Sequence, residues 1–410
     1  MPDGPEPQAS SVAVLPFRDQ SQTGDQNWLT EGLAEEILTS LARIPDLHVI
    51  ARQSSFALRD APFSEIGERL GATHVLSGSL QTDGTAARIR ARLTEVSGER
   101  EVWSSDFRPE LANVFETQEQ IARAVVDFLE VELGPIRDPG RITSSNTDAL
   151  AHENYLRGLR LWDRRSEAEI LTAIDHFRTA TERDASYASA WAGLSLAYLV
   201  LPEYSPEANV EQVREQSAAA AARSLELDPD QPDALTAMGW GRMIHHYDWQ
   251  GAEDLIGQAL AIDSTNVHAL HWQSHVFSWR GQHEEAIRLA RRAADLDPLS
   301  SIMRQNLAFI MKEAGFYDEA LQITEGVLAA DPNFVSGLRA HWSIHALSGR
   351  YEAAASALST WLVRTGRDAV AARAFADAYA ESAAAFAEQG VPGSLPRGLF
   401  DQLQPGLEMG

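Results

Sequence analysis

The spacing of apolar residues near the start of the chain alternates between two periods, which predicts strands and helices in turn. The apolar run SVAVLPF, at 11–17, is rich in β-branched residues and predicts a buried strand that ends at Pro16. In residues 28–43 the apolar side chains recur every three or four positions, which predicts an amphipathic helix. The same reasoning predicts these further elements in order: strand 47–52, helix 64–71, strands 73–80, 88–96 and 100–107, and helix 114–133.

The element order βαβαβββα is typical of an α/β domain with a mixed sheet. Asp83-Gly84 is a hairpin signal, so we expect the last three strands to form an antiparallel meander. A segment rich in Pro, Gly and Ser follows and breaks any continuing helix. The sequence therefore predicts a flexible tail at 1–10, an α/β domain at 11–134 and a linker at 135–147.

From residue 148 onwards small residues recur with a fixed period. Ala252, Ala286, Ala320 and Ala354 are spaced 34 residues apart, and glycines and acidic turn residues keep the same step. This period is that of the tetratricopeptide repeat, a helix–turn–helix unit that buries its apolar face only by stacking on its neighbours. We expect six repeats at 148–366, with Ala173 and Ser217 at the same position in the first two and a ten-residue insertion at 202–211. Residues 367–410 are expected to form a capping helix and tail.

The fold class expected is thus an α/β N-terminal domain followed by an all-α tetratricopeptide superhelix. A net charge of −25 argues against nucleic acid and anionic lipid as partners. Cysteine is absent, which excludes disulfides and thiolate chemistry, and no apolar run has the length of a membrane span. We expect a soluble, cytoplasmic chain without membrane insertion.

Motifs of catalysis are incomplete. HEEAI at 283–287 lacks the second histidine of a zinc protease, and Gly239-Trp240-Gly241 lacks the third glycine of a dinucleotide fingerprint. The one lysine, Lys312, is followed by Glu313 rather than by a phosphate-binding hydroxyl. The sequence predicts a chain that is not an enzyme and needs no cofactor.

The repeat register assigns certain side chains of the first helices to the concave groove. Aromatic rings and the few basic residues gather there, which favours docking of an extended peptide or a carboxylate. The predicted groove residues are Tyr155, Trp162, Arg165, His268, His271, His275, Trp279, Gln305, Phe309, Lys312 and Arg339.

Two further alternatives stay open, one for three histidines of the groove and one for the residues that follow a strand end. His268, His271 and His275 share one helix face at spacings that can bind zinc, although no cysteine or carboxylate cluster completes a ligand set, so we predict polar groove lining and no metal. Arg52, Ser54 and Ser55 follow a strand end, where open α/β sheets place ligands, although such residues also cap the next segment.

Four segments resemble the TolB-like (FlgO-like) amino-terminal domain of bacterial signalling proteins. They are SVAVLPF (11–17), EGLAEEILTSLARIPDLHVIARQSSF (31–56), GATHVLSGSLQ (71–81) and RARLTEVSGEREVWSSDF (90–107). Repeat segments such as AHENYLRGLRLWDRR (151–165) resemble the array that follows this domain in that family. The resemblance implies the sensory half of a chain whose effector is an adenylate cyclase, a Ser/Thr kinase or a winged-helix regulator, and we find no effector motif here.

The sequence therefore predicts a non-enzymatic scaffold or sensory module that binds a protein or peptide in its repeat groove. The alternative is the detached regulatory half of a bacterial signalling protein. A small-molecule or metal sensor is a further alternative, and a homodimer stays open.

Overall fold

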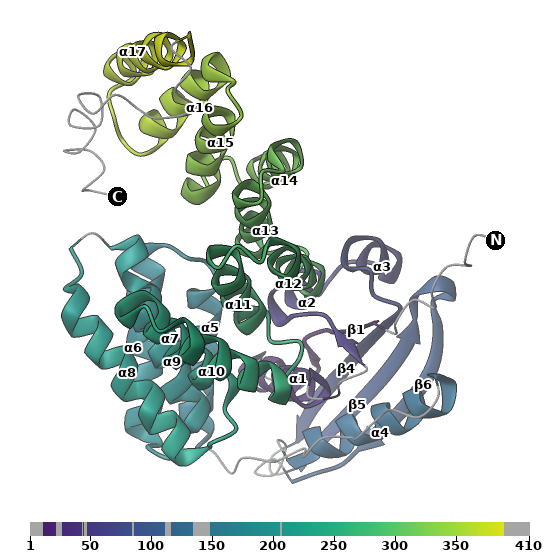
Figure 1. The fold of residues 1–410 in the computed structure, drawn as a ribbon. Helices are drawn as coiled ribbons and strands as arrows, with labels where there is room; N and C mark the ends of the chain where they lie inside the picture. The colour runs from purple at the N-terminus through teal and green to yellow at the C-terminus, as the bar shows by residue number, and fades with distance from the viewer. Residues whose placement is uncertain are drawn as a thin grey trace. The chain divides into compact units, whose positions relative to one another are not determined.

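The computed structural model describes residues 11–21, 27–42, 44, 47–83, 86–110, 116–133, 148–205 and 207–388 (Figure 1). The predicted tail at 1–10, the turn residue Gly84, the linker at 135–147 and the chain from 389 onwards lie outside the described residues. The chain divides into two compact units. The first comprises Met1–Trp272 with Asp295–Leu299, and the second comprises Gln273–Ala294 with Ser300–Gly410.

The first unit contains the mixed sheet that the sequence predicts. Its described strands are β1 (Ser11–Val14), β2 (Arg18–Asp19), β3 (His48–Val49), β4 (His74–Asp83), β5 (Ala86–Glu95) and β6 (Arg100–Phe107). Their order is β3-β1-β4-β5-β6, with β2 also paired to β4. β1 runs parallel to β3 and β4, whereas β4, β5 and β6 form the expected antiparallel meander (Figure 1).

Helices cover both faces of this sheet because its central strands carry apolar side chains on both sides. On one face α1 (Asn27–Ala42) and α4 (Glu116–Leu133) bury Val12, Val14 and Leu76. On the other face, residues of α3 (Phe63–Leu70) pack against Ala13 and Val75. The sheet is therefore the middle layer of an α/β domain.

The prediction of a strand over 47–52 is partly wrong. β3 contains only His48 and Val49, and Arg52 begins the short helix α2 (Arg52–Ala57). The sheet pairing of this edge strand ends where the Ile50 N–H donates to the Val12 carbonyl at 2.9 Å. The next amide, that of Ala51, donates to the Leu296 carbonyl at 2.8 Å, so a contact distant in sequence ends the strand.

Six consecutive helix pairs follow in the described residues, as the 34-residue period predicts. They are α5 (Ala149–Trp162) and α6 (Glu167–Arg183), α7 (Ala188–Tyr204) and α8 (Val210–Leu227), α9 (Pro232–His246) and α10 (Trp249–Ile262), α11 (Val267–Trp279) and α12 (His283–Leu296), α13 (Ser301–Glu313) and α14 (Tyr317–Ala330), and α15 (Val335–Leu347) and α16 (Tyr351–Arg364). The predicted insertion at 202–211 supplies the end of α7, the connection and the start of α8.

The small residue that defines the register is buried in every repeat. The five alanines at this position are 0% exposed, and Ser217 is 4% exposed. The Ser217 hydroxyl donates to the Ser195 carbonyl at 2.9 Å, which shows how closely α7 and α8 approach. A larger side chain at this position would separate the two helices of a repeat.

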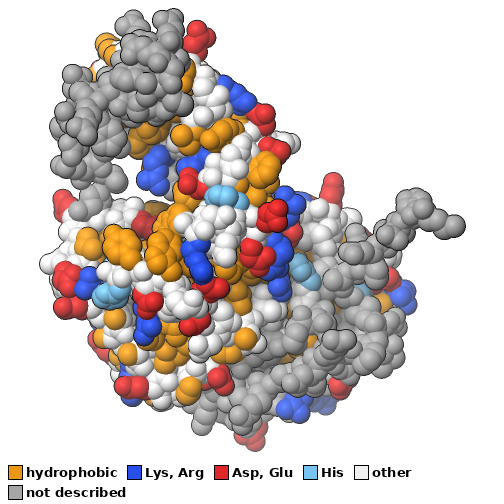
Figure 2. Space-filling model, viewed as in Figure 1, with side chains coloured by type: hydrophobic (Ala, Val, Ile, Leu, Met, Phe, Trp, Pro, Cys, Tyr) orange, Lys and Arg blue, Asp and Glu red, His pale blue; other side chains and the backbone are white. Residues whose placement is uncertain are grey.

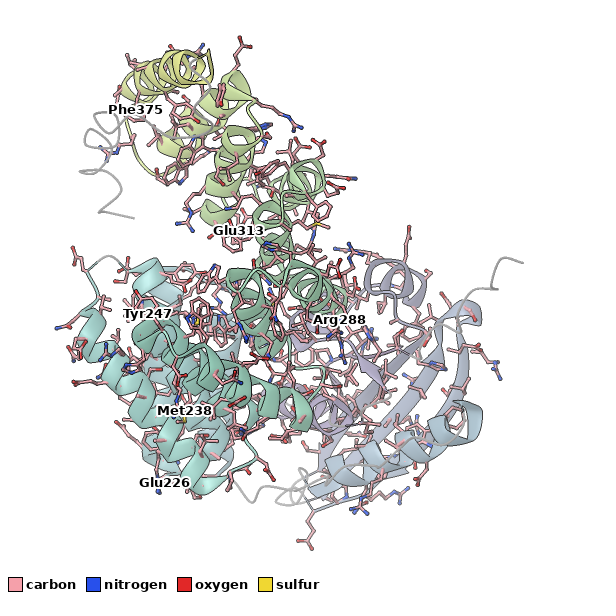
Figure 3. All side chains as sticks on the ribbon, viewed as in Figure 1. Glu226, Met238, Tyr247, Arg288, Glu313 and Phe375 are labelled. Atoms are coloured by element: carbon pink, nitrogen blue, oxygen red, sulfur yellow. The ribbon has the colours of Figure 1, made fainter. Side chains whose placement is uncertain are left out.

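The turn between the two helices of a repeat needs one residue in the left-handed region. Gly281, Gly315 and Gly349 supply it with φ of 77°, 86° and 75°. The third repeat has Tyr247 at the same position, with φ of 54° and a side chain that is 74% exposed (Figure 3). A side chain in this conformation costs roughly 1–2 kcal/mol, which the packing of the flanking helices must offset.

In the second unit the first helices of two repeats pack around alanines of the second helices. One core contains Ala290, Ala308 and Ile310, among others. A second core contains Leu358 of α16 and Tyr379 of α17 (Ala369–Glu388), so α17 covers an apolar side of α16. Among the described residues, no helix combines the length and apolar character needed to cross a membrane.

Two glycine substitutions, expected to change the free energy of unfolding in opposite directions, test the packing of the first repeat. A Cβ at Gly158 would lie 2.6 Å from the ring of Phe177, which is 0% exposed, whereas a Cβ at Gly257 meets nothing within 4 Å. We expect Gly158→Ala to lower the free energy of unfolding by about 1–3 kcal/mol through overpacking. Gly257→Ala, at a half-buried helix position with open space around the new Cβ, should raise it by roughly 0.5–1 kcal/mol. Urea unfolding measures both, and a stabilised Gly158→Ala variant would contradict the packing described here.

Candidate functional site: the inner face of the repeats

The predicted groove residues fall into both compact units. The first-unit set consists of Tyr155, Trp162, Arg165, His268 and His271, and the second-unit set consists of His275, Trp279, Gln305, Phe309, Lys312 and Arg339. Within each set the structure brings several members into direct contact. The two sets differ in how much of their surface is open to solvent.

The first-unit set is centred on a buried indole. Trp162 at the end of α5 is 2% exposed, and the ring of His268 on α11 lies with its centroid 4.6 Å away. Arg165 lies on the turn that follows α5, and its guanidinium carbon is 3.8 Å from the centroid of the Trp162 ring. Tyr155 contacts the Tyr187 ring edge-on with centroids 5.1 Å apart. An outside partner cannot reach Trp162 in this arrangement.

Helix α1 of the α/β domain packs against α5 and contributes to this burial. A Cβ at Gly32 of α1 would lie 3.0 Å from both His152 Nε2 and Leu156 Cδ1 on α5. Glycine is therefore the residue that allows the two helices to approach so closely. His152 is itself 3% exposed, and its Nδ1 lies 2.7 Å from the Tyr187 hydroxyl.

An ion network links the same two helices. Arg52 Nε lies 2.5 Å from a Glu35 oxygen on α1, and its Nη1 lies 3.1 Å from an Asp163 oxygen at the end of α5. The three side chains are 12%, 11% and 20% exposed. Glu31, one turn before Glu35, pairs with Arg160 of α5. Removing one partner of a buried pair of this kind costs about 3–5 kcal/mol, because a buried charge is left without compensation.

A second contact connects the α/β domain to the fourth repeat. The Ser54 hydroxyl of α2 donates to Asp297 Oδ1 at 2.6 Å, and the Ser54 N–H donates to the same oxygen at 3.2 Å. The Leu299 N–H in turn donates to the Ser54 hydroxyl oxygen at 2.8 Å. Asp297 and Leu299 belong to the segment that is part of the first unit. The α/β domain thus contacts repeats one and four.

A cleft of ≈ 390 Å³ remains between these elements of the first unit, and we call it the junction cleft. Its walls come from α1, the start of α2 and the inner sides of the first four repeats, with Glu35, Tyr155, Trp162, Asp233 and His268 among the lining residues. Burial raises the pKa of Glu35 to about 7, although the Arg52 charge beside it acts in the opposite direction. Burial also raises the pKa of Asp233.

The second-unit set is more accessible. Trp279 is 44% exposed, and His275 lies between its ring and that of Phe309, with centroid distances of 5.6 and 5.0 Å. Lys312 Nζ lies 4.5 Å from the centroid of Phe309 and 3.0 Å from an oxygen of Glu313, which is labelled in Figure 3. The other two members differ: Gln305 is 7% exposed, whereas Arg339 is exposed.

His268 in the first unit and His275 in the second are both held in the neutral form by burial. Burial lowers the pKa of His268 to about 3 and that of His275 to about 4. In the part of the chain that the structure describes, no three His, Asp or Glu side chains are grouped in a way that could hold a metal ion. His271 instead lies edge-on to the Trp272 ring, with centroids 5.9 Å apart.

The residues after β3 have a role that neither sequence alternative includes. Arg52 and Ser54 connect the α/β domain to the repeats, and Ser55 donates to the Ile50 carbonyl at 3.3 Å. Helix α2 begins after Ala51 without a side-chain cap. The sequence missed Glu35 and Asp163 as positions that connect the α/β domain to the repeats, because each reads as an ordinary solvated charge on an amphipathic helix or turn.

Comparison with known proteins identifies the repeats. The family model described as "Tetratricopeptide repeat" matches residues 280–341. A curated protein of Rhizobium meliloti (strain 1021), "Putative adenylate cyclase 3", is 26% identical over 246 residues, which are 58% of this chain and 42% of that protein. The match thus spans less than half the length of this relative.

Several solved repeat proteins are similar in structure, with low TM-scores. YrrB, a tetratricopeptide repeat protein "with an unusual peptide-binding site", is 20% identical with a TM-score of 0.33 over 48% of this chain and 97% of that chain. PilF of Pseudomonas aeruginosa is 22% identical with a TM-score of 0.39 over 55% and 99%. PilW, a type IV pilus biogenesis factor, is 15% identical with a TM-score of 0.41 over 54% and 96%.

The raised pKa of Glu35 predicts a specific dependence of stability on pH. The folded state favours the protonated carboxyl, so its contribution is complete below the unfolded pKa of 4.5 and is lost as the pH rises through about 7. We expect the stability of Glu35→Gln, which cannot ionise, to fall less than that of wild type as the pH rises across this window, whatever constant cost the loss of the Arg52 ion pair adds. Urea unfolding at a series of pH values measures this difference. The matched control is Glu65→Gln, whose side chain is 43% exposed on α3, and an equal slope in both variants would contradict the prediction.

Proposed function

We propose that this chain is a non-enzymatic interaction protein that binds a protein or peptide partner on the inner face of the repeats in the second unit. The tetratricopeptide repeats themselves support a scaffold for protein contacts. The observation that carries the proposal is the difference between two tryptophans of the predicted groove. Trp162 is 2% exposed and packed against His268 and Arg165 of its own chain, whereas Trp279 is 44% exposed.

The chemistry of the second-unit set suits an extended peptide that carries a carboxylate. Trp279 and Phe309 offer aromatic rings, and the exposed Arg339 offers positive charge in a chain whose net charge is −25, whereas Lys312 is 13% exposed and paired with Glu313. Charged side chains of both signs are interspersed over the repeats in Figure 2, so local charge rather than net charge would guide docking. Aromatic and basic anchors of this kind commonly carry most of the binding energy of an interface.

The test is capture of binding partners from the native lysate by the full chain. We expect the variant Trp279→Ala with Arg339→Glu to lose most of the partners that the wild type retains. Both side chains are exposed, so the melting temperature should change little, because surface substitutions usually alter stability by less than about 0.5 kcal/mol. Capture by the wild type should also weaken with salt.

A matched control carries the same kinds of substitution away from this face. Leu171 on α6 is 44% exposed, as Trp279 is, and Arg291 on α12 is an exposed base on a second helix. Leu171→Ala with Arg291→Glu should capture the same partners as wild type. Equal capture by all three proteins would place the binding surface outside the second-unit set.

A second candidate function is favoured by the relative named as an adenylate cyclase. We propose as the alternative that this chain is the regulatory part of a bacterial signalling system, in line with the resemblance of residues 11–107 to the TolB-like domain. A nucleotide cyclase, Ser/Thr kinase or winged-helix regulator encoded beside this chain, and captured by it, would support this alternative. The purified chain should form no cyclic nucleotide from ATP, and measurable formation would overturn the non-enzymatic proposal as well.

A further inference from the structure

A separate cleft of ≈ 280 Å³ lies in the α/β domain at the carboxyl end of β1, and we call it the β1 cleft. The chain passes from β1 to β3 on one side through α1, and from β3 to β4 on the other side through α2 and α3. The strand order therefore reverses at β1. Open α/β sheets commonly bind ligands outside the carboxyl ends of their strands at such a point.

The walls of the β1 cleft combine an apolar side with a basic side. Three of its lining residues are arginines, whereas Glu99 is the acidic residue of the described lining. This excess of positive charge stands out in a chain of net charge −25. The apolar side includes Pro62 and Phe63, and the basic side includes Arg18, Arg59 and Arg92, with Ser77 beside them in the lining.

Sheet register explains why Arg92 has no carboxylate partner among the described residues. Arg90 on β5 lies opposite Asp106 on β6, which accepts hydrogen bonds from it and from Arg88. Two residues further along β5, Arg92 lies opposite Ser104 on β6 and Ser77 on β4, neither of which carries a charge. Arg88, Arg90 and Arg92 point to the same face of the sheet, because every second side chain along a strand lies on the same face.

Arg18 reaches the same cleft from β2. In the β2–β4 pairing Arg18 lies opposite Ser79, so β4 presents a hydroxyl rather than a carboxylate to it. Within the described residues neither Arg18 nor Arg92 forms an ion pair, and both side chains are exposed. Arg59 completes the basic wall, pairs with Glu31 at 2.8 Å and stays 44% exposed.

We propose that the β1 cleft binds a small organic anion. Arg18 and Arg92 hold its oxyanion, a phosphate or a carboxylate, because a guanidinium presents a planar pair of donors that matches both groups. The apolar part of the ligand lies against Pro62 and Phe63. The cleft volume suits a compact molecule rather than a polymer.

The test is calorimetric titration of the full chain with three probes: inorganic phosphate, phenyl phosphate and benzoate. We expect one equivalent of a phenyl-bearing probe to bind, with affinity falling as salt rises. Arg18→Gln with Arg92→Gln should weaken this binding about tenfold or more. Whether phenyl phosphate or benzoate binds more tightly identifies the oxyanion.

Two further variants separate specific recognition from general charge. Arg69→Gln with Arg100→Gln removes the same charge from exposed positions outside the cleft and should leave binding unchanged. Phe63→Ala should weaken binding of the phenyl-bearing probes more than that of inorganic phosphate.

Binding of none of the three probes at millimolar concentration would overturn the proposal, as would equal losses in the cleft variant and the control. If the double variant does not fold, Arg92→Gln alone carries the test, since Arg92 is exposed and without an ion pair in the described structure. Partner capture by the repeats is a separate readout, so either proposal can fail without the other.

Discussion

The structure of the first unit depends on one guanidinium placed between two carboxylates. Arg52 begins the helix after β3 and lies between Glu35 of the α/β domain and Asp163 of the first repeat. A charge this far from water is stable only when its partners stay in place. The position of α1 against α5 and the closeness of Gly32 to His152 satisfy that requirement together. The α/β domain is consequently part of the repeat scaffold rather than a separate body.

This arrangement gives chemically similar positions different roles. Trp162 and Trp279 both belong to first helices and both read as groove residues, but the first is covered from within the chain. Arg165 and Arg339 also differ, because the first is half-buried and stacked on the Trp162 indole whereas the second is exposed. A solenoid surface that its own chain partly occupies has less area for partners and presents that area at defined repeats.

The sequence predicted the features that recur along the repeats, and it missed a long-range contact that occurs at a single repeat. Ala286 and Ala320 share a phase and are both fully buried, so periodicity alone fixed the register and the helix pairs. The succession of strands and helices along the chain, and the antiparallel meander, followed from local alternation and a hairpin signal. Asp297, however, has the same phase as Asp263 and Asp331, and nothing local distinguishes it. Its contact with Ser54 joins residues 243 positions apart, a distance that no periodic pattern encodes.

That contact has a consequence for how the array folds. In the neighbouring repeats the turn aspartate accepts a hydrogen bond from the amide two residues on, as Asp263 does from Thr265 and Asp331 does from Asn333. In the fourth repeat the Ser54 hydroxyl stands between Asp297 and the Leu299 amide. A linear array can grow from any repeat towards its neighbours. Here the native bonding of Asp297 needs Ser54 of the N-terminal domain, so one contact of long sequence separation is added to an array whose repeat-to-repeat contacts are local, and such contacts slow folding.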